Sequence, residues 1–149
     1  MDILNTLKKD HKKVLEILDK LESTSNRAGK SRQKLFEQLK EELLPHMYAE
    51  ENYLYPYLLD RTSEEEQREK IMQGEEEHHA ARSVLSDATK VSFSDEHWHP
   101  DIQVLRELIS HHIEEEESEI FDIAEEVVED SDEVSQKFVA MKSKSTLKV

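Results

Sequence analysis

The sequence has no cysteine, only two glycines and three prolines, and no long apolar run among its 149 residues. The lack of cysteine excludes disulfides, thiolate metal ligands and cysteine nucleophiles. No stretch approaches the roughly 18 apolar residues of a membrane span, and the N-terminal MDILNTLKKD lacks the apolar core of a signal peptide. We therefore expect a cytoplasmic protein that does not associate with membranes.

Acidic residues dominate the charge of the chain. The 35 Asp and Glu residues against 20 Lys and Arg residues give a formal net charge of −15, which repels a phosphate backbone and argues against nucleic-acid binding. Charged residues make up 37% of the sequence and hydrophobic residues 36%, a balance that suits long helices with one narrow apolar stripe each. An all-α fold is expected.

Apolar residues recur at alternating intervals of three and four along four long segments, as they do on the buried face of bundle helices. A short fifth helical segment follows them. The expected helices span approximately 2–21, 32–58, 63–89, 95–128 and 131–141. We expect an antiparallel up-down four-helix bundle with a short fifth C-terminal helix in one domain over 1–143, followed by a flexible basic tail over 144–149.

Local signals mark two helix starts and two irregular points. Ser31 is the expected N-cap of the second helix and Ser63 that of the third, where Glu66 completes a capping box. Pro45 removes a helical hydrogen bond and is expected to kink the second helix, and Pro56 is expected to end or bend it.

A histidine replaces an apolar residue in the stripe of each long helix, and two of these histidines are followed by a glutamate one turn later. The histidines are His11, His46, His78 and His112, and the glutamates are Glu50 and Glu116. Their places on the core-facing lines predict that all six side chains are buried. Because a buried carboxylate loses several kcal/mol of solvation, these acids need partners.

The chain contains an internal repeat. DHKKVLEIL at 10–18 resembles EHHAARSVL at 77–85, and HMYAEENYLYP from residue 46 resembles HIEEEESEIFD from residue 112. Two matching helical hairpins therefore face each other in the expected bundle. The buried acids and imidazoles either neutralise each other as ion pairs or, as the double repeat favours, bind first-row transition ions. Six ligands exceed a tetrahedral zinc site, whereas two bridging glutamates would build a dinuclear centre with open coordination positions.

This H, HxxxE, H, HxxxE pattern resembles the hemerythrin-like, or HHE cation-binding, family. The flanking words DH, EENYLYP and HHIEEEESEIF fit as well, and the likeness covers nearly the whole chain. The resemblance implies two non-haem iron ions bridged by an oxo or hydroxo group and by Glu50 and Glu116, with the four histidines as terminal ligands. The oxygen-carrying form has a further histidine on the third helix and an aspartate on the fourth. Here Gly74 and Arg82 lie four residues before and four residues after His78, and neither is a histidine. The fourth-helix carboxylate is a glutamate.

The resemblance implies binding or sensing of O2 or a related small ligand, such as peroxide or NO, at the open iron positions. An apolar shell is expected to slow the entry of water, and its members are Leu7, Val14, Leu39, Leu43 and Ile109. Two alternatives stay open. One is an enzyme that disproportionates hydrogen peroxide or reduces NO at the same centre, and the other is a protein that stores or donates iron.

Several other tyrosine, glutamate and histidine residues lie near the predicted ligands or in a second histidine-rich segment. Tyr53 and Glu119 each lie seven residues beyond a ligand histidine, and either is an extra ligand or, as we favour, a residue at the edge of the core. His79 and His111 are expected at the surface or outside the ligand shell. The DEHWHPD segment, a candidate second metal site, is interpreted as the start of the fourth helix with Trp98 packed inward.

Overall fold

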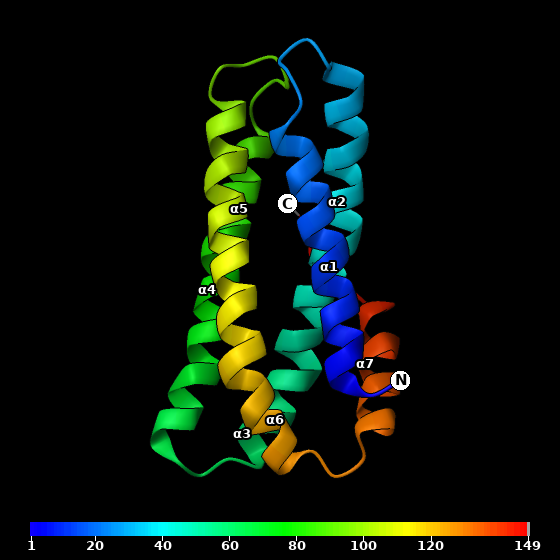
Figure 1. Ribbon diagram of the computed structural model, residues 1–149, viewed down its shortest axis with the longest axis vertical. Coiled ribbons are helices and arrows are strands. Elements are labelled where there is room, and N and C mark those ends of the chain that lie inside the picture. Colours follow the sequence, from blue (N-terminus) through cyan, green and yellow to red (C-terminus); the bar gives the residue numbers. More distant parts are fainter. Residues whose placement is uncertain (149) are drawn as a thin grey trace.

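The described residues, 1–148, of the computed structural model form seven α-helices and two π-helical turns, with no strand (Figure 1). The elements are α1 Ile3–Glu22, α2 Gly29–Ala49, η1 Glu50–Leu54, α3 Tyr55–Asp60, α4 Glu65–Thr89, α5 Trp98–Glu115, η2 Glu116–Ile120, α6 Phe121–Val127 and α7 Ser131–Lys142. Because α2, η1 and α3 follow one another without a break, as do α5, η2 and α6, the chain has four long helical lines. The expected four-helix bundle with a fifth C-terminal helix is confirmed.

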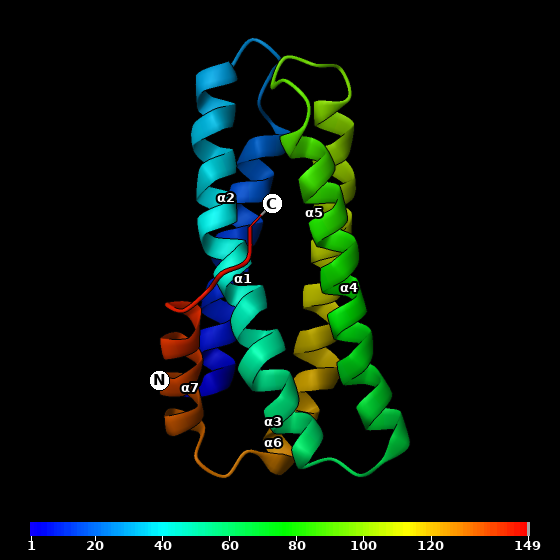
Figure 2. The ribbon, with the colours of Figure 1, turned by 180° about the vertical axis from the view of Figure 1, so that it is seen from behind.

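The four helical lines run side by side and are joined by loops at both ends of the bundle (Figure 2). α1 packs against α2 and α5, and α4 packs against α5, so the two repeated hairpins face each other. α7 lies against α1 and α2. Within the described residues, every helix is too short or too polar for a membrane span.

Two apolar clusters fill the bundle, one toward each end. Val14 and Leu43 belong to the first cluster, and Leu7 and Leu54 belong to the second. His11 lies between Leu7 and Val14 along α1, and the other buried histidines and glutamates occupy the same level of their helices. A buried polar layer therefore separates the first apolar cluster from the second.

Trp98 closes the end of the first apolar cluster. It is fully buried and packs edge-on against Phe36 and Phe93, with the Arg32 guanidinium 4.5 Å above its ring. Arg32 also donates hydrogen bonds to the carbonyls of Phe93 and Thr24 and so joins two neighbouring loops. The structure confirms that Trp98 packs inward.

The starts of α2 and α4 differ from the expected ones. α2 begins at Gly29 without a side-chain cap, so Ser31 lies inside its first turn. α4 begins at Glu65 and has no side-chain cap from Ser63. The reason at α4 is that the Arg68 side chain returns to bind two carbonyls of the preceding turn, which fixes the chain before the helix without a capping box.

The start of α5 was also predicted incorrectly, and the second helical line does not end at Pro56. α5 begins at Trp98 because Asp95 accepts the backbone N–H of His97 and folds this stretch into a turn. α2 continues as α-helix through Pro45, and Pro56 lies inside α3 rather than at its end. The irregular segment is η1, which begins one turn after Pro45.

α7 ends at Lys142, one residue beyond the expected end of the fifth helix. Part of the tail predicted over 144–149 contacts the bundle, because Leu147 is partly buried against the first apolar cluster. The last residue of that predicted tail, Val149, lies outside the described residues.

The first apolar cluster is expected to carry much of the stability. Leu85 is completely buried in it, whereas Val104 on α5 is 47% exposed. Leu85→Ala should lower the free energy of unfolding by about 2–5 kcal/mol, because it leaves a cavity in a closely packed interior. Val104→Ala, the matched control, should change it by less than about 0.5 kcal/mol. Urea denaturation of the metal-free protein measures both, and equal effects would contradict the assigned core.

Candidate metal centre

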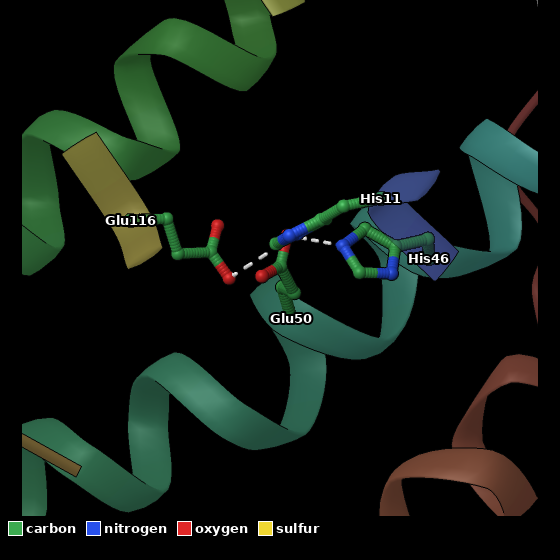
Figure 3. Close-up of side chains that lie close together, drawn as sticks. All are labelled: His11, His46, Glu50 and Glu116. Carbon is green, nitrogen blue, oxygen red and sulfur yellow. Dashed lines mark ion pairs between the residues drawn. The ribbon is translucent and has the colours of Figure 1, made fainter. Parts of the chain in front are cut away.

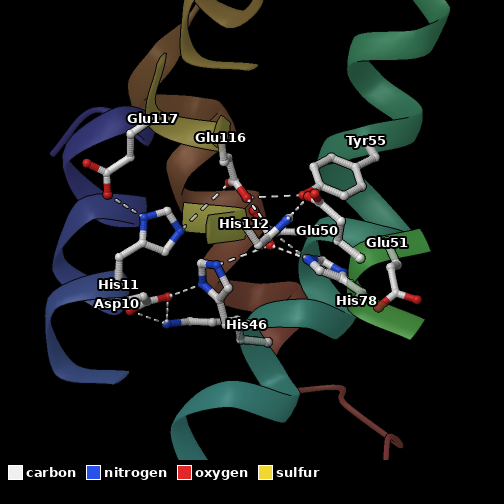
Figure 4. A network of polar contacts seen from close by, with 12 residues as sticks. Asp10, His11, His46, Glu50, Glu51, Tyr55, His78, His112, Glu116 and Glu117 are labelled. Carbon is white, nitrogen blue, oxygen red and sulfur yellow. Dashed lines mark hydrogen bonds and ion pairs between the residues drawn. The ribbon is translucent and has the colours of Figure 1, made fainter. Parts of the chain in front are cut away.

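Six side chains from all four helical lines converge in the buried polar layer (Figure 4). None is more than 6% exposed. They are His11 of α1, His46 of α2, Glu50 of η1, His78 of α4, His112 of α5 and Glu116 of η2. These are the six residues that the sequence predicts as metal ligands.

The six residues form two groups of four that share both glutamates. One group contains His11 and His46, and the other contains His78 and His112. In each group one nitrogen or oxygen atom per residue lies within 4.8 Å of all the others. Figure 3 shows the first group, in which His11 and His46 approach the two carboxylates from the same side of the bundle.

The distances show that the two carboxylates lie between the histidine pairs. Glu50 Oε1 is 3.2 Å from His46 Nε2 and 3.0 Å from His78 Nε2, so this oxygen reaches both groups. Glu116 Oε2 is 3.0 Å from His112 Nε2, while its Oε1 is 3.8 Å from His11 Nε2. Each glutamate therefore faces one histidine from either pair, which is the arrangement of a bridging carboxylate.

The outer nitrogen of each of the four buried histidines contacts a carboxylate that lies outside the cluster of six. The four contacts are His11 Nδ1 with Glu117 at 2.7 Å, His46 Nδ1 with Asp10 at 2.9 Å, His78 Nδ1 with Glu51 at 3.1 Å, and His112 Nδ1 with Glu77 at 2.8 Å. An ionised carboxylate only accepts hydrogen bonds, so each Nδ1 donates its proton outward. In a neutral ring the lone pair then stands on Nε2, which points into the centre.

The inner atoms lack partners of their own. Both oxygens of Glu50, one oxygen of Glu116 and Nε2 of His11 are buried without a hydrogen bond of acceptable direction, despite the short distances to neighbouring groups. His78 Nε2 lies only 3.0 Å from His112 Nε2. Two inward lone pairs at that distance would repel each other, so a proton or a metal ion must lie between them. The donor atoms therefore fit metal ions.

Both π-helical turns begin at the shared glutamates. In η1 the N–H of Tyr55 bonds to the carbonyl of Glu50, and in η2 the N–H of Phe121 bonds to the carbonyl of Glu116, one residue farther than in an α-helix. The extra residue in each π turn rotates the following helical residues about the helix axis, relative to their places in a regular α-helix. Such turns occur often at functional sites, and here they place an aromatic ring from each line over a histidine.

The rotation explains where Tyr53 and Glu119 lie. The Tyr53 ring packs at a tilt against Tyr57 at the edge of the bundle, with the two ring centres 6.0 Å apart. Glu119 is 43% exposed and forms an ion pair with Lys70 at 3.3 Å. Neither side chain belongs to the groups that could hold a metal.

Tyr55 is the residue beside the centre that the sequence did not indicate. It is fully buried, its ring stacks on His78 with centres 5.5 Å apart, and its hydroxyl donates to Glu116 Oε2 at 3.1 Å. Burial and the charges of Glu116 and Glu50 hold the pKa of the phenol well above its usual value, so it remains a donor. Gly74 makes room for it, since a Cβ there would lie 3.1 Å from the Tyr55 hydroxyl.

The remaining histidines lie outside the centre. His111 is 63% exposed and contacts Glu115 at 3.0 Å and Glu77 at 3.8 Å, forming a small acidic group on the surface beside His112. His79 is exposed. Within residues 1–148, none of the groups that could hold a metal includes the histidines of the DEHWHPD segment.

Protons take the place of metal charge in the metal-free centre. Burial alone would lower the pKa of His46, but the Glu50 carboxylate and the bond to Asp10 raise it to about 10. Burial also opposes the charge on His112, yet its bonds to Glu116 and Glu77 raise its pKa to about 10. The surroundings of both rings therefore stabilise positive charge.

The comparisons with known proteins agree with this geometry. Residues 2–124 match the family model of the hemerythrin HHE cation-binding domain. The chain belongs to that family. The hemerythrin-like bundle is also similar to the crystal structure of a hemerythrin HHE cation-binding domain-containing protein from Mycobacterium kansasii, with a TM-score of 0.80. The two sequences are 21% identical, and the match covers 97% of this chain and 86% of that one, so the likeness shows a shared fold. A search of curated proteins gave no match.

Membership of the hemerythrin family and the buried cluster together show a metal-binding site with histidine and glutamate ligands. The family match ends before α7, which begins at Ser131. The assignment of each of the six residues as a ligand stays a prediction.

The raised pKa values predict how pH affects the metal-free protein. The folded-state pKa of His46 and His112, about 10, lies above the usual 6.5, so their stabilising charge is fully present below pH 6.5 and is lost as pH rises toward 10. The free energy of unfolding should fall by several kcal/mol over this range, since a tenfold change in proton affinity corresponds to about 1.4 kcal/mol.

Urea denaturation at a series of pH values measures this fall. A metal-free His46→Gln, His112→Gln double variant is the control and should lose the extra pH dependence. The zinc-loaded protein should lose it as well, because metal then replaces the protons. If the free energy of unfolding changed equally with pH in all three samples, His46 and His112 would not be the source of the pH dependence.

Proposed function

We propose that the hemerythrin-like centre holds two non-haem iron ions, bridged by Glu50, Glu116 and an oxo or hydroxo group, and binds O2 or a related small ligand. The observation that carries the proposal is the common orientation of the four histidines, whose Nε2 atoms all face two carboxylates that both groups share. Two nitrogens and two bridging oxygens leave coordination positions free on each ion. Ferrous ions held by these residues would supply the electrons that O2 binding requires.

The charge around the centre supports two divalent ions. Six carboxylates surround the four histidines: Asp10, Glu50, Glu51, Glu77, Glu116 and Glu117. Lys142 forms an ion pair with one of them and Arg82 with another. Six negative charges less two positive ones leave four, which is the charge that two divalent cations neutralise before an oxo or hydroxo group is added.

A small cavity on the histidine side of the layer supports a small ligand. It is lined by the four histidines and by Val14, Leu43, Met47, Ile109 and Ile113. About 10 Å³ is open to the centre of a water-sized molecule, room for one such molecule. Three members of the predicted apolar shell line this cavity, and the other two, Leu7 and Leu39, are buried nearby in the core. An apolar wall favours O2 over bulk water.

Iron loading tests this function. After anaerobic loading with ferrous iron, the protein should contain about two irons per chain and should develop oxo-to-ferric charge-transfer bands on exposure to air. His112→Ala should lower the iron content to about one per chain and abolish the bands, because one ion loses a terminal ligand. The exposed His97→Ala is the control. One iron per chain in the unmodified protein, or full loading of His112→Ala, would refute the dinuclear centre.

A second candidate function is the disproportionation of hydrogen peroxide, in which two H2O2 give O2 and two H2O. Tyr55 favours it, because this reaction needs a proton for the departing oxygen and the Tyr55 hydroxyl is a buried donor beside Glu116. Tyr55 belongs to the second apolar cluster, so it lies across the polar layer from the apolar cavity. Peroxide would use this opposite face.

Tyr55→Phe separates the two candidates. Phe121 already stands at the equivalent place of the other repeat and stacks on His11, so a phenyl ring fits the fold. If the protein disproportionates peroxide, the variant should evolve O2 about 100-fold more slowly while keeping its iron content, since general acids contribute 10²–10⁴-fold. An oxygen electrode measures the rate. Undiminished O2 evolution would exclude Tyr55 as the proton donor, and no evolution from the unmodified iron-loaded protein would exclude this function.

A further inference from the structure

α7 lies beyond the family match, yet it runs alongside α1 (Figure 1). Ser131 accepts the backbone N–H of Ile3 at 2.9 Å near the start of α7, and the hydroxyls of Ser135 and Thr6 lie 2.6 Å apart one turn later. These contacts fix the position of α7 along α1. The end of α7 therefore comes level with the buried polar layer.

At that level α7 contacts the carboxylate that holds the outer nitrogen of His46. Lys142 Nζ donates to both oxygens of Asp10, at 3.1 and 2.9 Å, and Asp10 accepts the Nδ1–H of His46 at 2.9 Å. Phe138, fully buried, packs edge-on against the His46 ring with centres 5.6 Å apart. His46 is thus held from outside by two contacts that depend on α7, one polar and one apolar.

In the other half of the centre, Arg82 pairs with Glu51, which holds His78, but the carboxylate equivalent to Asp10 has no such support. By the internal repeat, Glu77 corresponds to Asp10 and holds His112. The second oxygen of Glu77 faces His111 at 3.8 Å, and no lysine or arginine forms an ion pair with Glu77 within the described residues. The repeat is therefore broken at this place.

We propose that Lys142 is a positioning residue for the ion held by His11 and His46, and that it acts through Asp10. This inference rests on the proposed occupancy by two ions. Lys142 fixes the Asp10 carboxylate, and the fixed carboxylate holds the His46 ring with Nε2 turned toward the metal. The ion held by His78 and His112 does not depend on Lys142.

Removal of the Lys142 side chain is expected to weaken metal binding, whereas the loss of its positive charge alone would strengthen it. Lys142→Met takes away a positive charge, which by itself would tighten the binding of any cation nearby. If Lys142 instead orients Asp10, the variant frees a mostly buried carboxylate to turn toward water, and His46 loses its orientation. Metal affinity at one position should then fall about 10- to 100-fold, as it does when outer partners of a ligand histidine are removed.

Zinc binding by the metal-free protein, measured in competition with a chromophoric chelator, tests the proposal. The unmodified protein should bind two zinc ions. Lys142→Met should weaken one binding step about 10- to 100-fold and leave the other unchanged, and Lys142→Arg should restore it because it keeps a donor to Asp10. Lys137→Met is the matched control, since Lys137 lies on the same helix but pairs with the exposed Glu133. It should leave both steps unchanged.

A second pair of variants tests whether Lys142 acts through Asp10. Asp10→Ala should cause the same selective loss, and adding Lys142→Met to it should cause no further loss. Two bound ions with unchanged, tighter or equally weakened steps in Lys142→Met would overturn the positioning role while leaving the dinuclear centre intact. A single zinc bound by the unmodified protein would overturn both this inference and the proposed function.

Discussion

Each of the four histidines donates its Nδ1–H to a carboxylate outside the centre, and the remainder of the site depends on these four bonds. They decide which ring nitrogen carries the proton, and so they turn four lone pairs toward one small volume. A bundle interior tolerates such a set only when protons or metal ions bind to it, because unpaired polar groups cost more in a low-dielectric interior than in water. The fold is thus adapted to metal through residues that do not themselves reach the metal.

The π turns are the second constraint. A regular helix after Glu50 would continue the core line through Tyr53 and Tyr57. The extra residue in η1 shifts that line by one position, so Leu54 and Leu58 are buried in their place. The same shift in η2 exposes Glu119 and buries Ile120. Glu50 and Glu116 keep their places on the core-facing line, and the helical residues that follow them are rotated about the helix axis.

The six inner residues could be predicted because they obey the helical period up to the π turns and recur in both repeats. Tyr55 could not, since its burial depends on a backbone irregularity that no residue type signals. The outer carboxylates had a signal that was missed. Asp10 and Glu77 each precede one of the buried histidines, while Glu51 and Glu117 each follow one of the two shared glutamates, so all four repeat with the predicted ligands. Capping at α2 and α4 was mispredicted because an arginine and backbone contacts replaced the serines.

The contact between Lys142 and Asp10 joins residues far apart in sequence, and periodicity within one helix carries no information about it. Its importance lies in how it breaks a symmetry. Within the polar layer the two halves are nearly equivalent, with two histidines each and both glutamates in common. Outside the layer they differ. Lys142 supports His46 through Asp10 in one half, whereas Arg82 supports His78 through Glu51 in the other. Tyr55, in the space left by Gly74, covers His78, while Phe121 and Leu7 stand at the equivalent places beside His11. The symmetric cluster offers two similar groups of donor atoms. Its asymmetric surroundings make the two groups unlike in charge and hydrogen bonding, so a metal ion bound in one group would meet a different environment from an ion bound in the other.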